Sequence, residues 1–215
     1  MEDARFTRFI EDDGSVNYFG MYTAFDGSHL NQYLLETTNF QTFDVTKLIG
    51  HAARNKGMAL FPRRINGEFA ALSRWDNENI SVARSTDIKK WDASVELPIP
   101  RQPWEFVKLG NCGPPIETPD GWLVLTHGVG AMREYSIGAV LLDLNDPSKM
   151  IGSLNEPLMS PTEEERDGYS PNVLYSCGAL LHEDRLLFPY GCSDDSVRIA
   201  LIDLPELMIR LRASR

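Results

Sequence analysis

Turn signals recur along this chain at a nearly constant interval. An Asp or Asn precedes each of Gly14, Gly67 and Gly121, and these glycines are 53 and 54 residues apart. A fourth turn signal, Glu183-Asp184, follows about 60 residues later. Asn-Gly and Asp-Gly between β-forming residues are strong signals of a tight β-hairpin. A repeat of this length, with almost no helical periodicity around it, predicts a series of similar antiparallel β-sheets.

A second pattern repeats in step with the first. Residues 35–43 and 83–91 each combine a strand-like run with a Thr-Asn or Thr-Asp turn and a later aromatic residue. Two apolar runs, 140–144 and 199–204, occupy the same place in the later units. Each unit therefore contains two hairpins, which is the four-stranded blade of a β-propeller. The alternative is a β-sandwich with coincidental turn spacing, and the doubled repeat favours the propeller.

These repeats predict an all-β fold in which about four blades lie in one domain, residues 1–215. Only residues 205–211 suggest a helix. The net charge of −10 at pH 7 argues against a nucleic-acid or anionic membrane partner, because either would need a basic face. No apolar run approaches the length of a membrane span, and no signal peptide is visible.

The cysteines and histidines narrow the expected setting and chemistry. The three cysteines form no CxxC pair and no even framework, which is typical of free thiols in a reducing, cytoplasmic setting. The four histidines lack the spacing of a zinc site, so we expect no metal ion.

Polar residues at the start of each unit are the candidate functional residues, because the innermost strands of a propeller converge at its axis. The candidates include Asp3, Arg74, Lys108, His127, Asn172 and Asp194. Each also has a purely structural interpretation. On that interpretation, Asp3 would be a solvated residue near a terminus and His127 a histidine in an apolar core stretch. Asp194 would belong to a turn. Composition and spacing alone therefore predict no more than a propeller with a polar axis.

Short motifs follow one another in a fixed order along the chain. They lie at residues 2–5 (Glu-Asp-Ala-Arg), 22–24, 55–67, 74, 83–91, 108, 113–128, 142–149, 172–173 and 190–194. This series resembles glycoside hydrolase family 130, the β-mannoside phosphorylases, over nearly the whole chain. The resemblance implies a five-bladed propeller, and family members carry about one further blade before the first motif. We therefore expect an N-terminally truncated domain, whose open sheet edges favour association with a second copy.

The resemblance also implies a function. Family members phosphorolyse β-mannosides, such as manno-oligosaccharides or mannosyl-glucose, with inversion, and they release α-mannose 1-phosphate. The expected activity is thus that of a glycoside phosphorylase, which belongs to the glycosyltransferase type. Its partners are a small oligosaccharide and inorganic phosphate, with no metal or organic cofactor.

Individual roles follow from the same resemblance. Asp3 falls on the catalytic aspartate of the family's Glu-Asp-Pro-Arg motif, with alanine in place of its proline. Lys108 and His127 match residues that bind phosphate, and Arg74 is the arginine that we add to this anion site. The residues expected to bind the sugar are Asp194, Asn172 and Tyr135.

Two other functions stay open on the sequence. An inverting hydrolase needs a second carboxylate to activate water, whereas a phosphorylase needs basic groups to hold phosphate. Lys108 and His127 favour phosphorolysis, while Glu117 or Asp195 would be the base of an inverting β-mannosidase. A truncated propeller that binds glycan without turnover is the third possibility. The cleaved linkage, β-1,4 or β-1,2, and the acceptor sugar are not predicted.

Overall fold

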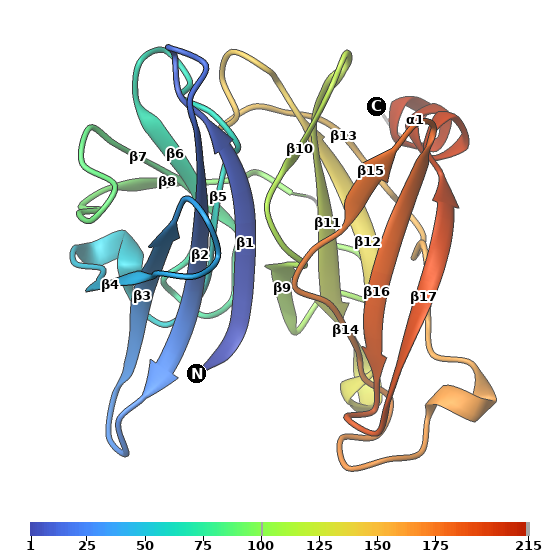
Figure 1. The fold of residues 1–215 in the computed structure, drawn as a ribbon. Coiled ribbons are helices and arrows are strands. Elements are labelled where there is room, and N and C mark those ends of the chain that lie inside the picture. The colour runs from blue at the N-terminus through green and yellow to red at the C-terminus, as the bar shows by residue number, and fades with distance from the viewer. Residues whose placement is uncertain (100, 214–215) are drawn as a thin grey trace.

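The computed structural model describes residues 1–99 and 101–213, and its strands form four sheets (Figure 1). Within each of the first two sheets, the strands are hydrogen-bonded in chain order. The first blade contains β1 (Glu2–Ile10), β2 (Val16–Phe25), β3 (Leu30–Thr37) and β4 (Asp44–Lys47). The second blade contains β5 (Lys56–Leu60), β6 (Phe69–Arg74), β7 (Ser81–Ser85) and β8 (Ser94–Glu96).

The third and fourth blades have an innermost position that is shared by two short strands. In the third blade, β9 (Lys108–Asn111) and β10 (Ile116–Thr118) pair with β11 (Gly121–Val129), followed by β12 (Tyr135–Leu142) and β13 (Met150–Ser153). In the fourth, β14 (Leu174–Tyr175) and β15 (Leu180–His182) pair with β16 (Arg185–Cys192), followed by β17 (Ser196–Asp203). The remaining elements are the 3-10 turns η1 (His51–Ala53), η2 (Ala131–Arg133) and η3 (Glu163–Glu165), and the helix α1 (Leu204–Ala213).

The predicted repeats correspond to these blades. The four turn signals lie in or beside the hairpins that start each sheet, and the second pattern falls on β3, β7, β12 and β17. The propeller prediction is therefore confirmed, and the β-sandwich alternative is wrong. The single predicted helix is also confirmed as α1, which buries Leu207, Met208 and Leu211 against the third blade.

Apolar side chains fill the three interfaces between consecutive blades, because alternate residues of each strand point to opposite faces of its sheet. Each interface is one cluster of buried residues. Between the first and second blades lie Phe9, Phe19, Met21, Leu34, Met58, Leu60 and Trp91, among others. Between the second and third lie Phe61, Leu72, Val82, Trp122, Val124 and Val140. Between the third and fourth lie Leu125, Ile137, Leu174, Phe188 and Leu211.

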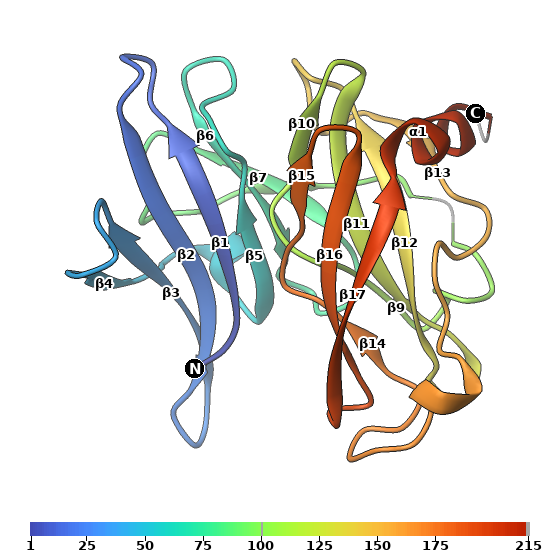
Figure 2. The same cartoon turned by 45° about the vertical axis from the view of Figure 1, so that its right-hand side comes forward.

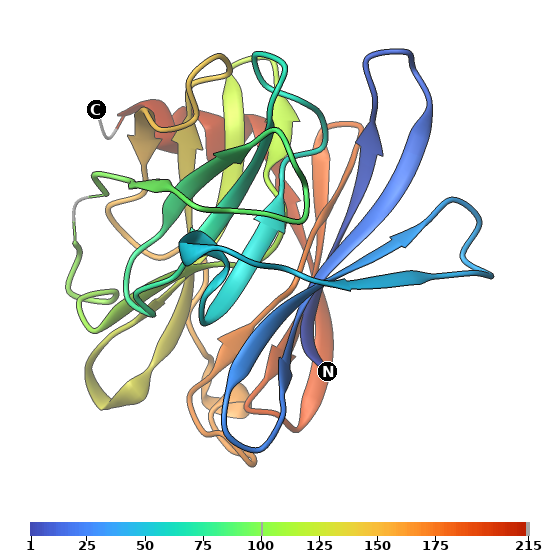
Figure 3. The same cartoon turned by 90° about the vertical axis from the view of Figure 1, so that its left-hand side faces the viewer.

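One face of the last blade stays open to solvent. Alternate positions of β17 carry Val197, Ile199 and Leu201, which are 78%, 67% and 60% exposed. No sheet of the described residues covers them. The chain begins beside the start of β1 and ends at α1, at opposite ends of the molecule (Figures 2 and 3). No helix in the described part of the chain is long and apolar enough to cross a membrane. The predicted domain limits and compartment stay predictions.

Candidate active site

The blades bring four of the predicted site residues, Asp3, Arg74, Lys108 and His127, towards the axis. Asp3 and Lys108 lie at the starts of the inner strands β1 and β9, and Arg74 ends β6 opposite Lys56. His127 lies opposite Gly110, two residues from the Lys108–Val129 pair. Polar residues of three blades therefore meet near the axis, Asp3 and Lys108 from strand starts and Arg74 and His127 from at or near strand ends.

A β-bulge positions Asp3. The pairing of β1 with β2 shifts register between Glu2 and Arg5, and Asp3 adopts a left-handed backbone conformation with φ of 57°. Bulges commonly redirect a side chain next to an active site. The side-chain Oδ2 of Asp3 accepts a hydrogen bond from the Tyr175 hydroxyl at 3.1 Å, and its backbone carbonyl accepts one from Arg5 Nη1 at 2.8 Å. Asp3 is thus held by the first blade at its backbone carbonyl and by the last blade at its carboxyl group.

Arg5 links all four blades. Its side chain is 2% exposed, and it donates from Nη2 to the Tyr175 hydroxyl at 2.7 Å and from Nε to Asn111 Oδ1 at 3.0 Å. Asn111 in turn donates from Nδ2 to the carbonyl of Gly57 at 2.6 Å. A buried charge needs such partners, because burying an ion without them costs on the order of several kcal/mol.

Sequence reasoning gave no role to Arg5, Asn111 or Tyr175. Of these three residues, Arg5 alone had a signal in the sequence. It is a charged residue at an inward-facing position of β1, in the same alternating series as Thr7 and Phe9. Nothing local marks Tyr175 or Asn111, because their partners are 170 and 106 residues away in the chain.

Arg74 is a buried donor with spare capacity. Its side chain is 7% exposed, and its Nη1 lies 3.2 Å from Nε2 of His127. Its Nε is buried and has no hydrogen-bond partner among the described residues. Gly110 permits this approach, because a Cβ there would lie 2.5 Å from both Arg74 Nη1 and the His127 ring. Buried donors are normally paired, so this N–H is free to bind an acceptor other than the described residues.

His127 is neutral in this environment. Burial lowers the pKa of His127 well below its usual value, and the positive charges of Arg74 and Arg5 lower it further. Because the guanidinium of Arg74 can only donate, Nε2 of the neutral ring accepts and Nδ1 carries the proton. Nδ1 lies 3.8 Å from Cys112 Sγ, and the ring stacks on Tyr135 at a centroid distance of 5.9 Å. In this state His127 orients Arg74 and is not itself a cation.

Lys108 completes the basic cluster. Burial and the neighbouring positive charge of Arg74 lower the pKa of Lys108, partly offset by Glu78. Close by, Lys56 Nζ pairs with Glu2 at 3.0 Å. Burial likewise lowers the pKa of Arg74. Cationic groups whose charged forms are disfavoured by burial and mutual repulsion are stabilised by a bound anion.

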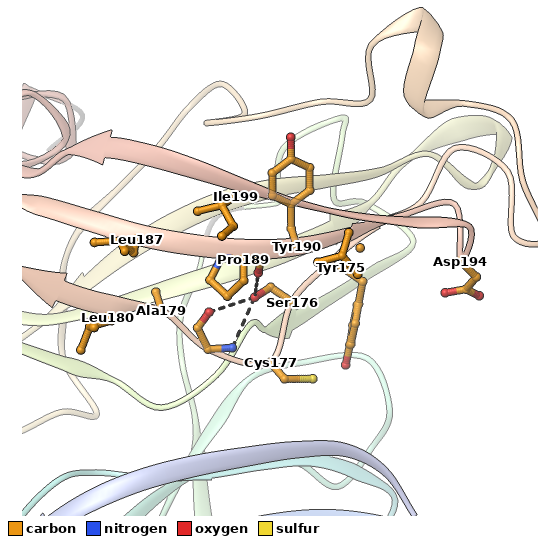
Figure 4. Close-up of a pocket in the computed structure, with 13 residues that line it drawn as sticks. Tyr175, Ser176, Cys177, Ala179, Leu180, Leu187, Pro189, Tyr190, Asp194 and Ile199 are labelled. Carbon is orange, nitrogen blue, oxygen red and sulfur yellow. Dashed lines mark hydrogen bonds between the residues drawn. The ribbon is translucent and has the colours of Figure 1, made fainter.

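Asp194 and Asn172 belong to a turn and a loop of the fourth blade, and among the described residues neither forms a hydrogen bond with the basic cluster. Asp194 is exposed in the β16–β17 turn and lines a cavity of about 640 Å³ together with Tyr175, on one side of it in Figure 4. The Asn172 side-chain oxygen is occupied by Arg166, and its backbone carbonyl accepts a hydrogen bond from Tyr135. Asp194 and Tyr175 thus line one cavity of the fourth blade, and the contact of Asp194 with a sugar stays a prediction. Asn172 holds the strand that carries Tyr135, and its contact with a sugar stays a prediction.

The two carboxylates considered as a hydrolytic base lie elsewhere or are solvated. Glu117 accepts hydrogen bonds from Arg63 Nε and Nη2, the shortest at 2.7 Å. It pairs with Trp122 at one end of β11, while Lys108 pairs with Val129 at the other. Seven residues of strand separate these points, on the order of 20 Å. Asp195 is exposed in the same turn as Asp194.

The neutral state of buried His127 should make stability fall in acid. Below the ordinary histidine pKa of about 6.5 the unfolded chain binds a proton that folded His127 does not, so stability decreases by about 1.4 kcal/mol per pH unit. Urea unfolding at pH 7.0 and 5.5 should therefore show a larger loss for the wild-type chain than for His127→Gln. The exposed His182→Gln variant is the control and should follow the wild type. Equal losses in all three chains would contradict a neutral His127.

Comparison with known proteins agrees with this arrangement. Residues 1–212 match the profile of glycoside hydrolase family 130, described as beta-1,4-mannooligosaccharide phosphorylase. The chain is 35% identical over 206 residues to the 1,2-beta-oligomannan phosphorylase of Thermoanaerobacter sp. (strain X514), covering 93% of this chain and 68% of that protein. It is 32% identical over 166 residues to the beta-1,4-mannooligosaccharide phosphorylase of Ruminococcus albus, covering 72% of this chain and 50% of that one.

A solved structure shows the same fold. The beta-1,2-mannobiose phosphorylase of Listeria innocua, in complex with beta-1,2-mannobiose, superimposes with a TM-score of 0.88 at 29% identity. The match covers 99% of this chain but 61% of that one, so the chain spans less than two thirds of the length of this relative. The blades, the motifs along them and these matches together show that the chain belongs to glycoside hydrolase family 130.

Proposed function

We propose that this chain catalyses the inverting phosphorolysis of β-mannosides to α-mannose 1-phosphate. The observation that carries the proposal is the buried Nε of Arg74, a donor with no acceptor among the described residues, in a cluster with Lys108. Phosphate offers several anionic acceptor oxygens, and charge-assisted hydrogen bonds from Arg and Lys to such oxygens are strong. The relatives bear names of β-mannoside phosphorylases, which supports the same substrate class.

The proposed step needs one acid and one bound anion. A phosphate oxygen attacks C1 of the mannosyl unit on the face opposite the leaving group, forming the C1–O bond while the glycosidic bond breaks. Asp3 gives its proton to the departing oxygen, directly or through a sugar hydroxyl. Arg74 and Lys108 hold the phosphate, and neutral His127 orients Arg74. The proposal requires no metal ion or organic cofactor.

The sugar would lie between Asp3 and the fourth blade. Asp194 and Tyr175 line one cavity of about 640 Å³, but its described lining lies within residues 175–199 of the fourth blade and contains neither Asp3 nor Lys108. The exposed Val197 and Ile199 belong to that lining, so the cavity itself is not assigned to the sugar. We assign Asp194 to a sugar hydroxyl, with Tyr135 and Asn172 at the border of the site. Relatives named for β-1,2 and for β-1,4 linkages match comparable parts of the chain, so the linkage is left to experiment.

The hydrolytic alternative is less well supported by the geometry. An inverting hydrolase needs a carboxylate to activate water. Glu117 is bound to Arg63 and lies far along β11 from Lys108, and Asp195 is exposed in a turn. With phosphate as the nucleophile, no second carboxylate is needed.

Product analysis decides between these functions. We expect β-1,2-mannobiose, β-1,4-mannobiose or mannosyl-glucose to release mannose 1-phosphate only when inorganic phosphate is present. Release of free mannose at the same rate with and without phosphate would show a hydrolase instead. No turnover in a folded sample, with glycan binding measurable by calorimetry, would show a binding propeller.

Removing the Lys108 ammonium should weaken phosphate binding. Lys108→Ala is expected to raise the KM for phosphate about 10- to 100-fold, because a hydrogen bond to a charged group contributes about 1.5–3 kcal/mol. The KM for the mannoside should change little. Lys89→Ala, an exposed lysine of the second blade, is the control. An unchanged phosphate KM in Lys108→Ala would remove Lys108 from the anion site.

A further inference from the structure

The Tyr175 hydroxyl lies between the two charged groups at the start of β1. It is 2.7 Å from Nη2 of Arg5 and 3.1 Å from Oδ2 of Asp3. Tyr175 belongs to β14 of the last blade, 172 residues from Asp3 in the chain. Its ring also packs on His127 at a centroid distance of 5.1 Å. The hydroxyl thus contacts the carboxyl group to which the proposed mechanism assigns the proton.

The direction of both hydrogen bonds is fixed by chemistry. A guanidinium has only donors, so the Tyr175 oxygen must accept from Arg5. The single hydroxyl proton is then directed to Asp3, whose Oδ2 accepts it. Burial raises the pKa of Tyr175 far above its usual value, although Arg5 partly opposes this, so the phenol keeps its proton. The order of donation from Arg5 to Tyr175 to Asp3 is therefore the only one available.

This order makes the two carboxyl oxygens of Asp3 unequal. Oδ2 is the acceptor of the Tyr175 proton, while Oδ1 has no hydrogen bond to any described residue. When Asp3 binds a proton, placing it on Oδ2 would set two protons against each other, whereas Oδ1 can take it without losing a contact. We propose that Tyr175 is a positioning residue that directs the catalytic proton of Asp3 to Oδ1.

The backbone around Asp3 makes such positioning necessary. Asp3 has a φ of 57° in a bulge of β1, and its side chain is only partly buried. Arg5 fixes the backbone carbonyl of Asp3, and Tyr175 fixes the carboxyl group. A general acid misplaced by about 1 Å can lose on the order of 10²-fold in rate. The inference rests on the proposed function only for its kinetic consequence, since the hydrogen-bond order itself does not require turnover.

The kinetic test is the variant Tyr175→Phe, which keeps the ring against His127 and removes only the hydroxyl. We expect kcat to fall about 10- to 100-fold, with the KM for phosphate unchanged, because orientation of the acid is lost but the anion site is not. The basic limb of the kcat profile should also move to higher pH, because the lost hydrogen bond favoured the ionised carboxylate. Structural damage alone would lower kcat without moving that limb.

The matched control is Tyr190→Phe. Tyr190 lies in the same blade and also donates its hydroxyl to a carboxylate, Glu165 Oε1, at 2.9 Å, pointing away from Tyr175 (Figure 4). This variant should keep the wild-type kcat and pH profile. An unchanged kcat and pH profile in Tyr175→Phe, with wild-type turnover present, would overturn the inference.

A second measurement is independent of turnover. In protein labelled with ¹³C at aspartate carboxyl carbons, the Asp3 resonance is the one lost in Asp3→Asn. We expect this resonance to titrate at a higher pH in Tyr175→Phe than in the wild type and in Tyr190→Phe. If the wild type releases no mannose 1-phosphate while this shift is observed, the proposed function fails and the hydrogen-bond order stands. If the resonance titrates identically in all three proteins, the inference is wrong whatever the activity.

Discussion

Asp3→Asn is expected to lower kcat for phosphorolysis about 10²- to 10⁴-fold, the range that general acid catalysis commonly contributes. The amide keeps the shape of the side chain and can still accept the hydrogen bond from Tyr175, so the fold and the neighbouring blade contacts persist. It cannot supply a proton to the leaving oxygen. Release of mannose 1-phosphate at saturating phosphate measures the loss, and calorimetry should show phosphate binding unchanged.

The leaving group offers a sharper form of this test. An aryl β-mannoside with an acidic phenol needs little protonation as it departs, so Asp3→Asn should lose much less activity on it than on mannobiose. Asp12→Asn, in the exposed turn between β1 and β2, is the control and should be indistinguishable from the wild type. A loss of less than about tenfold in kcat on mannobiose would be smaller than general acid catalysis contributes. In that case another group is the acid.

Arg5→Met is expected to have the largest effect on stability. The methionine fills the volume of the aliphatic stem, but the Tyr175 hydroxyl, Asn111 Oδ1 and the Asp3 carbonyl all lose a charged donor. Each lost bond to a charged donor costs about 1.5–3 kcal/mol, and Asn111 Oδ1 keeps a hydrogen bond from the Gly113 N–H, so we expect the free energy of unfolding to fall by about 3–5 kcal/mol. Urea unfolding monitored by tryptophan fluorescence measures this change.

Arg8 provides the matched control on the same strand. Arg8 lies on the opposite face of β1 from buried Arg5 and is exposed. Arg8→Met therefore removes an equal charge without breaking a buried contact. Exposed substitutions of this kind usually change stability by less than about 0.5 kcal/mol. If Arg5→Met and Arg8→Met unfold at the same urea concentration, the network around Arg5 contributes little to stability.

The sequence predicts the blades well because their signals are local. Asn66-Gly67 and Asp120-Gly121 specify turns by their own conformational preferences, and alternation along each strand specifies which face is buried. The convergence of Lys108 and Arg74 follows from the same repeat, since the start of an inner strand and the end of the strand paired with it lie at the same end of a blade. His127 combines both sequence interpretations, because it is buried like a core residue and also contacts Arg74.

The rest of the site could not be predicted in this way. Tyr175 is the second residue of a two-residue strand and follows an apolar residue. No pattern around it distinguishes it from an ordinary strand tyrosine. Its role exists only because the first and fourth blades meet at the axis. Glu117 lies in a family motif, yet its position beside Arg63 at the far end of β11 depends on the pairing of blades. Contacts that join distant segments carry no local signal.

The network around Arg5 also has a consequence for how the protein is made. Arg5 leaves the ribosome 170 residues before Tyr175, which is roughly 10–30 s at ordinary synthesis rates of 5–20 residues per second. During that interval the first blade can form its own hairpins, but its inward-facing charge has no hydroxyl to bind. The site is therefore assembled last, when the fourth blade arrives. A nascent chain released before β14 would carry Asp3 without the contacts that orient it.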